Sequence, residues 1–118
     1  LPVTAHTLFA IGSTTKAFTG ALLAQLHDQG KINFDAPVQT YLPEFTLKDP
    51  EVAKKLTLRD LMGHWTGLGR HDFAWYHRNL TRAEMLSLIP FLDLSVPPRT
   101  QFIYNNWMWV ASGPLPRA

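Results

Sequence analysis

Ser13 and Lys16 are the residues whose types and spacing most directly suggest chemistry. Both belong to the run Ser13-Thr14-Thr15-Lys16. If this run opens a helix, the two side chains lie on one face with Cβ atoms about 5–6 Å apart, so the amine can reach the hydroxyl. A serine hydroxyl is a weak nucleophile until a neighbouring base takes its proton, and a neutral lysine amine can act as that base. The S-x-x-K pattern therefore predicts Ser13 as a nucleophile and Lys16 as its partner.

A structural explanation of the same run stays open. Ser13 could cap a helix through its hydroxyl, and Lys16 could be a solvated side chain in the first turn. A lysine in the first turn opposes the helix dipole, which favours acidic side chains there. Because a pattern this short also recurs by chance, the surrounding elements have to decide between the two interpretations.

The element that carries this pair is predicted to be a helix over 13–29. Phe18, Leu22 and Leu26 recur at a spacing of four and predict an apolar face,. Gly30 is a typical stop, since glycine adopts the left-handed conformation without penalty. The preceding stretch, 7–12, is expected to be a short extended segment.

Further short helices are predicted from capping patterns. Asp49 followed by proline, and capping boxes beginning at Thr57 and Thr81, each indicate a helix start,. Pro90 is expected to end the third of these helices. A last apolar run over 107–111 predicts one more helix, whose side chains Trp107, Met108 and Trp109 are expected to pack beneath the site.

The composition is that of a globular protein. The chain has 118 residues, of which 46% are hydrophobic and 17% charged, with a net charge of +2. A charge this small, without a basic stripe, argues against nucleic acid as a partner. The sequence holds no cysteine, which excludes disulfides and thiol chemistry,. The sequence has no run of about 18 apolar residues, so it predicts no membrane-spanning helix. Since the chain begins at Leu1 in the middle of a pattern, we expect a fragment or a processed segment.

The segment 8–19 resembles the active-site segment of serine hydrolases of the class C β-lactamase and penicillin-binding protein-like family, the β-lactamase-related proteins. Those proteins place their nucleophile in an F-x-I-G-S-x-x-K-x-F setting, and this segment reads LFAIGSTTKAFT. Three later segments are similar to the family and follow in its order: 29–38, 57–68 and 102–106, the last of which carries the Y-x-N motif.

The resemblance implies a role for each residue of these motifs. Ser13 would be the acylated nucleophile and Lys16 its close partner. Tyr104 would be the phenolate base that later protonates the leaving group, and Asn106 would bind the substrate and hold Lys16. Tyrosine ionises near pH 10, so this role needs neighbouring cations. By themselves, Tyr104 could be a core aromatic residue and Asn106 a helix cap.

The fold implied by the resemblance is α+β, a helical domain with an antiparallel sheet as in the β-lactamase/transpeptidase-like fold. Residues 1–118 would be a partial domain, mainly α-helix and loop, running from the S-x-x-K helix to the Y-x-N motif. The family's third motif, K-T-G or H-x-G, does not occur after Asn106. We therefore expect the C-terminal sheet and a second oxyanion-hole donor to be missing, and the tail 112–118 to depart from the family's helix. Losing one such donor lowers kcat by about 10²–10³-fold.

The implied function is a serine acyl-enzyme hydrolase that cleaves an ester, amide or β-lactam bond in a small-molecule or peptide substrate, with no cofactor or metal. Two alternatives stay open. One is a penicillin-binding or sensor module that is acylated without turnover, and the other is a catalytically inactive truncated fragment. Relatives that act on cell-wall peptides or β-lactams work outside the cytoplasm, so the resemblance implies a periplasmic or exported protein, although no signal peptide is visible.

His64 is expected to be structural, and His71 and His77 to belong to a solvated or wall-forming loop. His64 suggests a Ser–His pair, but activation by lysine and tyrosine leaves no role for an imidazole. His71, Asp72 and His77 lack a recognised metal-ligand spacing.

The segment 70–76 resembles a stretch near the mouth of the site in one branch of the family. We therefore predict that Trp75 and Tyr76 influence substrate selection.

Overall fold

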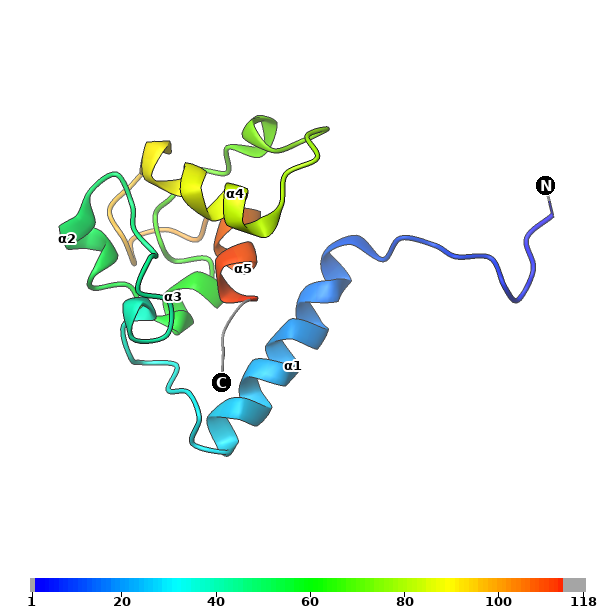
Figure 1. Cartoon of the computed structure of the whole chain (residues 1–118), viewed down its shortest axis with the longest axis horizontal. Helices are drawn as coiled ribbons and strands as arrows, with labels where there is room; N and C mark the ends of the chain where they lie inside the picture. Colours follow the sequence, from blue (N-terminus) through cyan, green and yellow to red (C-terminus); the bar gives the residue numbers. More distant parts are fainter. Residues whose placement is uncertain (1, 114–118) are drawn as a thin grey trace.

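Short helices joined by loops make up residues 2–113, the part of the chain that the structure, a computed structural model, describes (Figure 1). The α-helices are α1 (Thr15–Asp28), α2 (Pro50–Ala53), α3 (Leu58–Met62), α4 (Arg82–Leu88) and α5 (Asn106–Ser112). Single 3-10 turns are η1 (Gly12–Thr14), η2 (Val38–Thr40), η3 (Asp72–Ala74) and η4 (Ile89–Phe91). Within residues 2–113 there is no β-strand, and β-pairing is limited to two isolated antiparallel bridges, Pro37–Thr57 and Leu68–Leu94.

The predicted starts of the three short helices are confirmed. The Asp49 carboxylate caps α2, and capping boxes joining Thr57 to Asp60 and Thr81 to Glu84 open α3 and α4. Each cap satisfies N–H groups that a helix start leaves without a partner. Pro90 ends the α-helical hydrogen bonding of α4 as predicted, but the chain continues into η4, where the proline ring fits an early position,.

Helix α1 begins two residues later than predicted, since Ser13 lies in the preceding turn η1. It ends before Gly30, whose φ of +70° confirms the predicted glycine stop,. The predicted apolar face of α1 does not face the core. Phe18 and Leu22 are 67% and 62% exposed, while Leu23 is buried. Periodicity shows that a helix has an apolar side but not what covers it.

The core surrounds α5, which packs against α3 and α4. Trp107, Met108 and Ala111 of α5 are fully buried and meet buried leucines of α3 and of the loops around it. Because α5 follows Tyr104 directly in the sequence, burial of its apolar face fixes the position of the Y-x-N segment. The predicted departure of the tail concerns 112–118, of which 114–118 lie outside the described residues.

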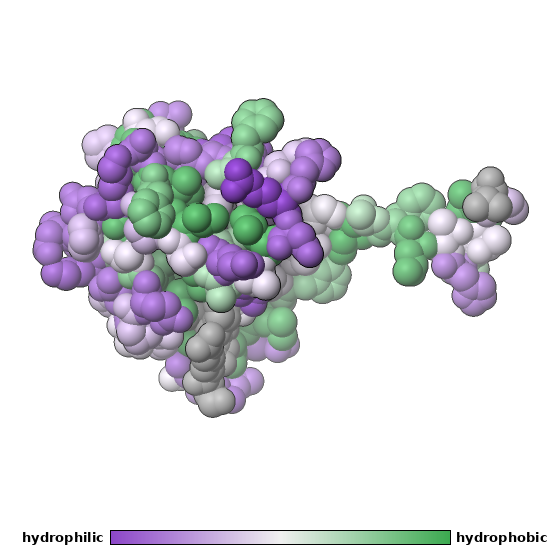
Figure 2. Space-filling model, turned by 45° about the horizontal axis from the view of Figure 1, so that its top comes forward, coloured by the Kyte–Doolittle hydropathy of each residue, from purple (hydrophilic) through white to green (hydrophobic). Residues whose placement is uncertain are grey.

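The segment before η1 projects from the rest of the molecule. Figure 1 shows it running as an extended trace away from α1, in line with the predicted entry segment. Figure 2 shows apolar side chains along it, and Leu8, Phe9 and Ile11 are exposed.

No helix within residues 2–113 is both long enough and apolar enough to span a bilayer.

Candidate active site

Ser13 lies in η1, at the N-terminal end of α1. Gly12 before it has a φ of +53°, which glycine adopts readily and which turns the chain into the helix,. Lys16 stands in the first turn of α1, and its Nζ donates a hydrogen bond of 3.1 Å to Ser13 Oγ. The contact inferred from the three-residue spacing is therefore present.

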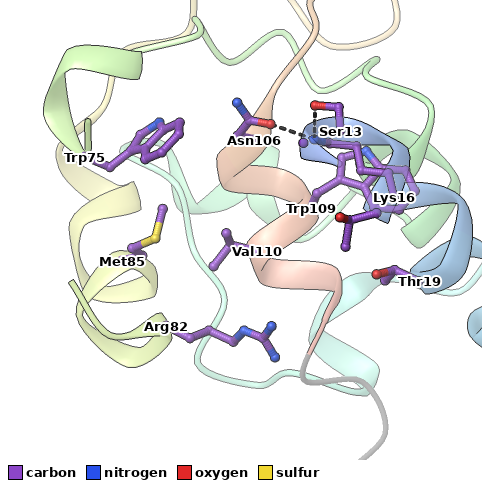
Figure 3. Close-up of a pocket in the computed structure, with 11 residues that line it drawn as sticks. Ser13, Lys16, Thr19, Trp75, Arg82, Met85, Asn106, Trp109 and Val110 are labelled. Carbon is purple, nitrogen blue, oxygen red and sulfur yellow. Dashed lines mark hydrogen bonds between the residues drawn. The ribbon is translucent and has the colours of Figure 1, made fainter. Parts of the chain in front are cut away.

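A second segment of the chain completes the cluster. Lys16 Nζ donates a 2.7 Å hydrogen bond to Asn106 Oδ1 (Figure 3). The Tyr104 hydroxyl is hydrogen-bonded to Ser13 Oγ. The structure thus brings together all four predicted site residues, although Lys16 and Asn106 are 90 positions apart in the sequence.

Asn105, whose role the sequence did not predict, holds the second segment in place. Its Oδ1 accepts from the Met108 N–H at 3.1 Å and so caps α5. Its Nδ2 donates to the carbonyl oxygens of Leu68 and Gly69 at 3.1 and 2.8 Å. This side chain is fully buried, so the helix-cap role weighed for Asn106 belongs to its neighbour. Asparagine two residues before the helix predicted over 107–111 was the available signal.

The charges and hydrogen bonds of the cluster change the pKa of Tyr104. Partial burial by itself raises the pKa of this phenol, but hydrogen bonding with Lys16 and Ser13 and the charges of Lys16 and Arg70 outweigh it. The pKa of Tyr104 is therefore held below its ordinary value of 10.0. Lys16 Nζ lies 4.8 Å from the centre of the Tyr104 ring. A cation this close favours the phenolate form that a base requires.

His64 packs against Tyr104 of the cluster. It is buried, and its ring lies against that of Tyr104 with centroids 4.5 Å apart. Its Nδ1 accepts a hydrogen bond of 3.0 Å from the Asn105 N–H. Burial, and secondarily the charge of Lys16, lower the pKa of His64 below its usual 6.5. These contacts agree with the structural role predicted for His64.

A pocket of about 400 Å³ opens beside Ser13, between the start of α1, helix α4 and helix α5 (Figure 3). Trp75, Met85 and Val110 form its apolar wall, with Arg82 at the end away from Ser13. Of the two residues predicted to influence substrate selection, Trp75 lines both this pocket and a neighbouring one, whereas Tyr76 lines only the neighbouring one.

Trp109 departs from the prediction that it packs in the core beneath the site. It is half-buried, and it lines the same pocket as Ser13.

A serine at a helix start, hydrogen-bonded by a lysine and a tyrosine, has the composition of a serine-centred acyl-transfer site. The family model described as Beta-lactamase matches residues 1–113. The chain therefore belongs to the beta-lactamase family, as the resemblance of its motifs implied.

Two curated relatives show the range of this similarity. An unguisins hydrolase of Aspergillus campestris is 34% identical over 122 residues, aligning with 96% of this chain and 23% of that protein. A teichoic acid D-alanine hydrolase of Staphylococcus aureus is 41% identical over 80 residues, aligning with 68% of this chain and 19% of its own length. The chain thus spans less than a quarter of the length of these relatives.

Solved structures show the same fold. A D-amino acid amidase from Ochrobactrum anthropi SV3, complexed with L-phenylalanine, aligns with a TM-score of 0.78 and 25% identity, over 96% of this chain and 32% of that one. A D-stereospecific amidohydrolase from Streptomyces sp. shares the fold, with a TM-score of 0.74 over 89% of this chain and 35% of that one. The prediction of a helix-rich part of the β-lactamase/transpeptidase-like fold is confirmed for residues 2–113, and the antiparallel sheet of the complete fold stays a prediction.

Proposed function

We propose that the protein is a serine hydrolase that works through an acyl-enzyme formed on Ser13, cleaving an ester, amide or β-lactam bond. The observation that carries the proposal is the double hydrogen bonding of Ser13 Oγ, by Lys16 Nζ and by the Tyr104 hydroxyl. A serine that meets both a cation and a group able to take its proton is activated for attack on a carbonyl carbon.

In the proposed reaction, the Tyr104 phenolate takes the proton of the Ser13 hydroxyl as Oγ bonds to the substrate's carbonyl carbon. The Tyr104 hydroxyl then returns this proton to the leaving oxygen or nitrogen as its bond to that carbon breaks. Lys16 stays a cation and stabilises the phenolate, and Asn106 Oδ1 fixes Lys16 at 2.7 Å. Water repeats the sequence on the acyl-enzyme and frees Ser13.

The names of the relatives support this reaction class. They include a teichoic acid D-alanine hydrolase and a D-amino acid amidase, and hydrolysis of an amide transfers an acyl group to water. The pocket beside Ser13 has a volume of about 400 Å³, which falls in the range of small-molecule sites. We propose a small-molecule or short peptide substrate.

The test is to incubate the protein with a fluorescent penicillin and, separately, with p-nitrophenyl acetate, and to follow product release and intact mass. Release of product beyond one equivalent supports the hydrolase. A persistent adduct without turnover supports the acylated sensor, and absence of any adduct supports an inactive chain.

Ser13→Ala should abolish both adduct and turnover, whereas the matched control Ser87→Ala should keep them. Ser87 is an exposed serine on α4 whose hydroxyl only donates to the carbonyl oxygen of Glu84. An adduct that forms equally well in Ser13→Ala contradicts the proposal.

A further inference from the structure

Arg70 is a second cation at Tyr104, supplied by a segment outside the S-x-x-K and Y-x-N motifs. Its guanidinium carbon lies 5.4 Å from the centre of the Tyr104 ring, compared with 4.8 Å for Lys16 Nζ. An arginine within about 6 Å of an aromatic centroid interacts with the ring, and its charge favours an ionised phenol still more.

An ion pair fixes this guanidinium. Arg70 Nε donates a hydrogen bond of 2.9 Å to Asp72 Oδ2, and Nη2 lies 2.8 Å from the same oxygen. The Asp72 side chain is 30% exposed and Arg70 is 56% exposed, so the pair is only partly in solvent. Two guanidinium nitrogens that converge on one carboxylate oxygen restrict the orientation of the guanidinium, which the single amine of a lysine cannot reproduce.

The backbone on both sides of Arg70 is tied to the segment that carries Tyr104. The carbonyl oxygen of Gly69 accepts from Asn105 Nδ2 at 2.8 Å, and that of His71 accepts from Trp107 Nε1 at 3.3 Å. Asn105 and Trp107 flank Asn106 in the Y-x-N segment and the start of α5. Arg70 and Tyr104 are therefore held by two parts of the chain that hydrogen-bond directly to each other.

The backbone between the two charged residues is in an unusual conformation. His71 has a φ of +45°, in the left-handed region that side-chain-bearing residues rarely adopt,. Its Nε2 contacts the Asp93 carbonyl oxygen at 2.8 Å, which helps hold it there. This turn places Arg70 and Asp72 so that their side chains meet.

We propose that Arg70, oriented by Asp72, is a positioning residue that tunes Tyr104 for its task as a base. It acts through the phenol and does not need to touch substrate. The charged and titratable groups around Tyr104 are Lys16 of α1, His64 below the ring, and the Arg70–Asp72 pair. Burial lowers the pKa of His64, whose Nδ1 accepts from the Asn105 N–H, so Lys16 and Arg70 supply the positive field. The inference rests on the proposed role of Tyr104 in catalysis.

The experiment titrates Tyr104 directly, with the protein labelled by [13Cζ]tyrosine and observed by NMR. The chain has three tyrosines, and Tyr104→Phe identifies the signal. We expect Arg70→Gln to raise the Tyr104 titration midpoint by about 0.5–1 pH unit. The acidic limb of the kcat/KM profile for p-nitrophenyl acetate should move by the same amount, giving about three- to tenfold lower kcat/KM on that limb.

Arg70→Lys keeps the charge but not the fixed guanidinium, so it should retain only part of the effect. The matched control Arg78→Gln, at an exposed arginine, should leave the midpoint unchanged. The inference is overturned if Arg70→Gln titrates like the unchanged protein or if Arg78→Gln shifts the midpoint equally. Arg70→Met replaces Arg70→Gln if the latter does not fold.

The two proposals fail separately. If Tyr104 titration depends on Arg70 but Ser13 is never acylated, the proposed function fails and the inference on the phenol stands. If Ser13 is acylated but neither the titration nor the pH profile responds to Arg70, the inference fails alone.

Discussion

The backbone N–H of Asn105 donates a hydrogen bond to Nδ1 of His64, at 3.0 Å. Because Nδ1 accepts this bond, the buried imidazole is neutral and carries its proton on Nε2. His64 has a φ of +64°, and its carbonyl oxygen accepts from the Ile103 N–H at 2.9 Å. One histidine therefore contacts the Y-x-N segment through its ring and through its backbone, directly beneath Tyr104.

Protonation of His64 should destabilise the fold. In the unfolded chain His64 takes up a proton near its usual pKa of 6.5, whereas in the folded protein burial and Lys16 lower that pKa. Between these two values the unfolded state binds more protons, so the free energy of unfolding falls as the pH drops below about 6.5 and is fully retained above it. Urea unfolding at about pH 7.5 and about pH 5.5 measures this loss.

His64→Asn should reduce that pH dependence, since asparagine tolerates the left-handed backbone and its Oδ1 can accept from Asn105 without titrating. The matched control is His77→Asn, which changes an exposed histidine with a φ of +60°. Equal pH dependence in both variants would show that His64 is not the group responsible.

Removing the phenol hydroxyl should slow acylation without affecting the fold. We expect Tyr104→Phe to lower the rate of Ser13 acylation by about 10²–10⁴-fold, the typical contribution of a general base. Tyr76→Phe, at an exposed tyrosine outside the Ser13 pocket, should acylate at the normal rate. Single-turnover release of p-nitrophenol measures both, and an unimpaired Tyr104→Phe variant would assign the base to another group.

Trp75 and Tyr76 should differ in their effect on substrate preference, because Trp75 alone of the two lines the Ser13 pocket. Trp75→Ala should change the ratio of kcat/KM values for p-nitrophenyl acetate and p-nitrophenyl hexanoate by about tenfold or more. Tyr76→Ala should leave that ratio unchanged. The prediction is wrong if Trp75→Ala, like Tyr76→Ala, discriminates between the two esters as the original protein does.

The Asp60–Arg99 pair should matter for stability far more than the Lys48–Asp93 pair. Asp60 is 8% exposed, and both its oxygens accept from the Arg99 guanidinium, at 2.8 and 2.7 Å. Arg99→Gln leaves this carboxylate largely buried and partly unpaired. We expect a loss of about 1–3 kcal/mol in the free energy of unfolding, toward the low end because Arg99 itself is half in solvent.

Lys48→Gln is the matched control for that comparison. Its ion pair with Asp93 is 64% and 69% exposed, so its loss should change stability by less than about 0.5 kcal/mol. Urea unfolding of both variants decides the point, and equal losses would contradict the importance of the buried carboxylate.

The features that were predictable from sequence are local ones. The contact of Ser13 with Lys16 and the capping boxes at Thr57 and Thr81 depend on residues three apart within one turn of helix, so spacing determines them. The meeting of Tyr104 with Ser13 was inferred from resemblance alone, since no local rule joins segments so far apart in the chain.

Contacts between distant segments account for what the sequence did not reveal. Arg70 lies beside the Tyr104 ring because the backbone on both sides of Arg70 is hydrogen-bonded to Asn105 and Trp107. The exposure of Phe18 and Leu22 is likewise a tertiary property, since an amphipathic pattern does not specify the surface that covers it.

Asn105 has a consequence for how variants of this protein would be interpreted. Aspartate at position 105 would place a carboxylate against two carbonyl oxygens. Leucine would leave both carbonyl oxygens and the Met108 N–H without partners. Serine is too short to reach all three groups. In a saturation library selected for activity, positions 104, 105 and 106 would therefore be equally intolerant. A parallel selection for abundance would separate them. Variants at 105 would be lost from both selections, whereas variants at 104 and 106 would be lost only from the selection for activity.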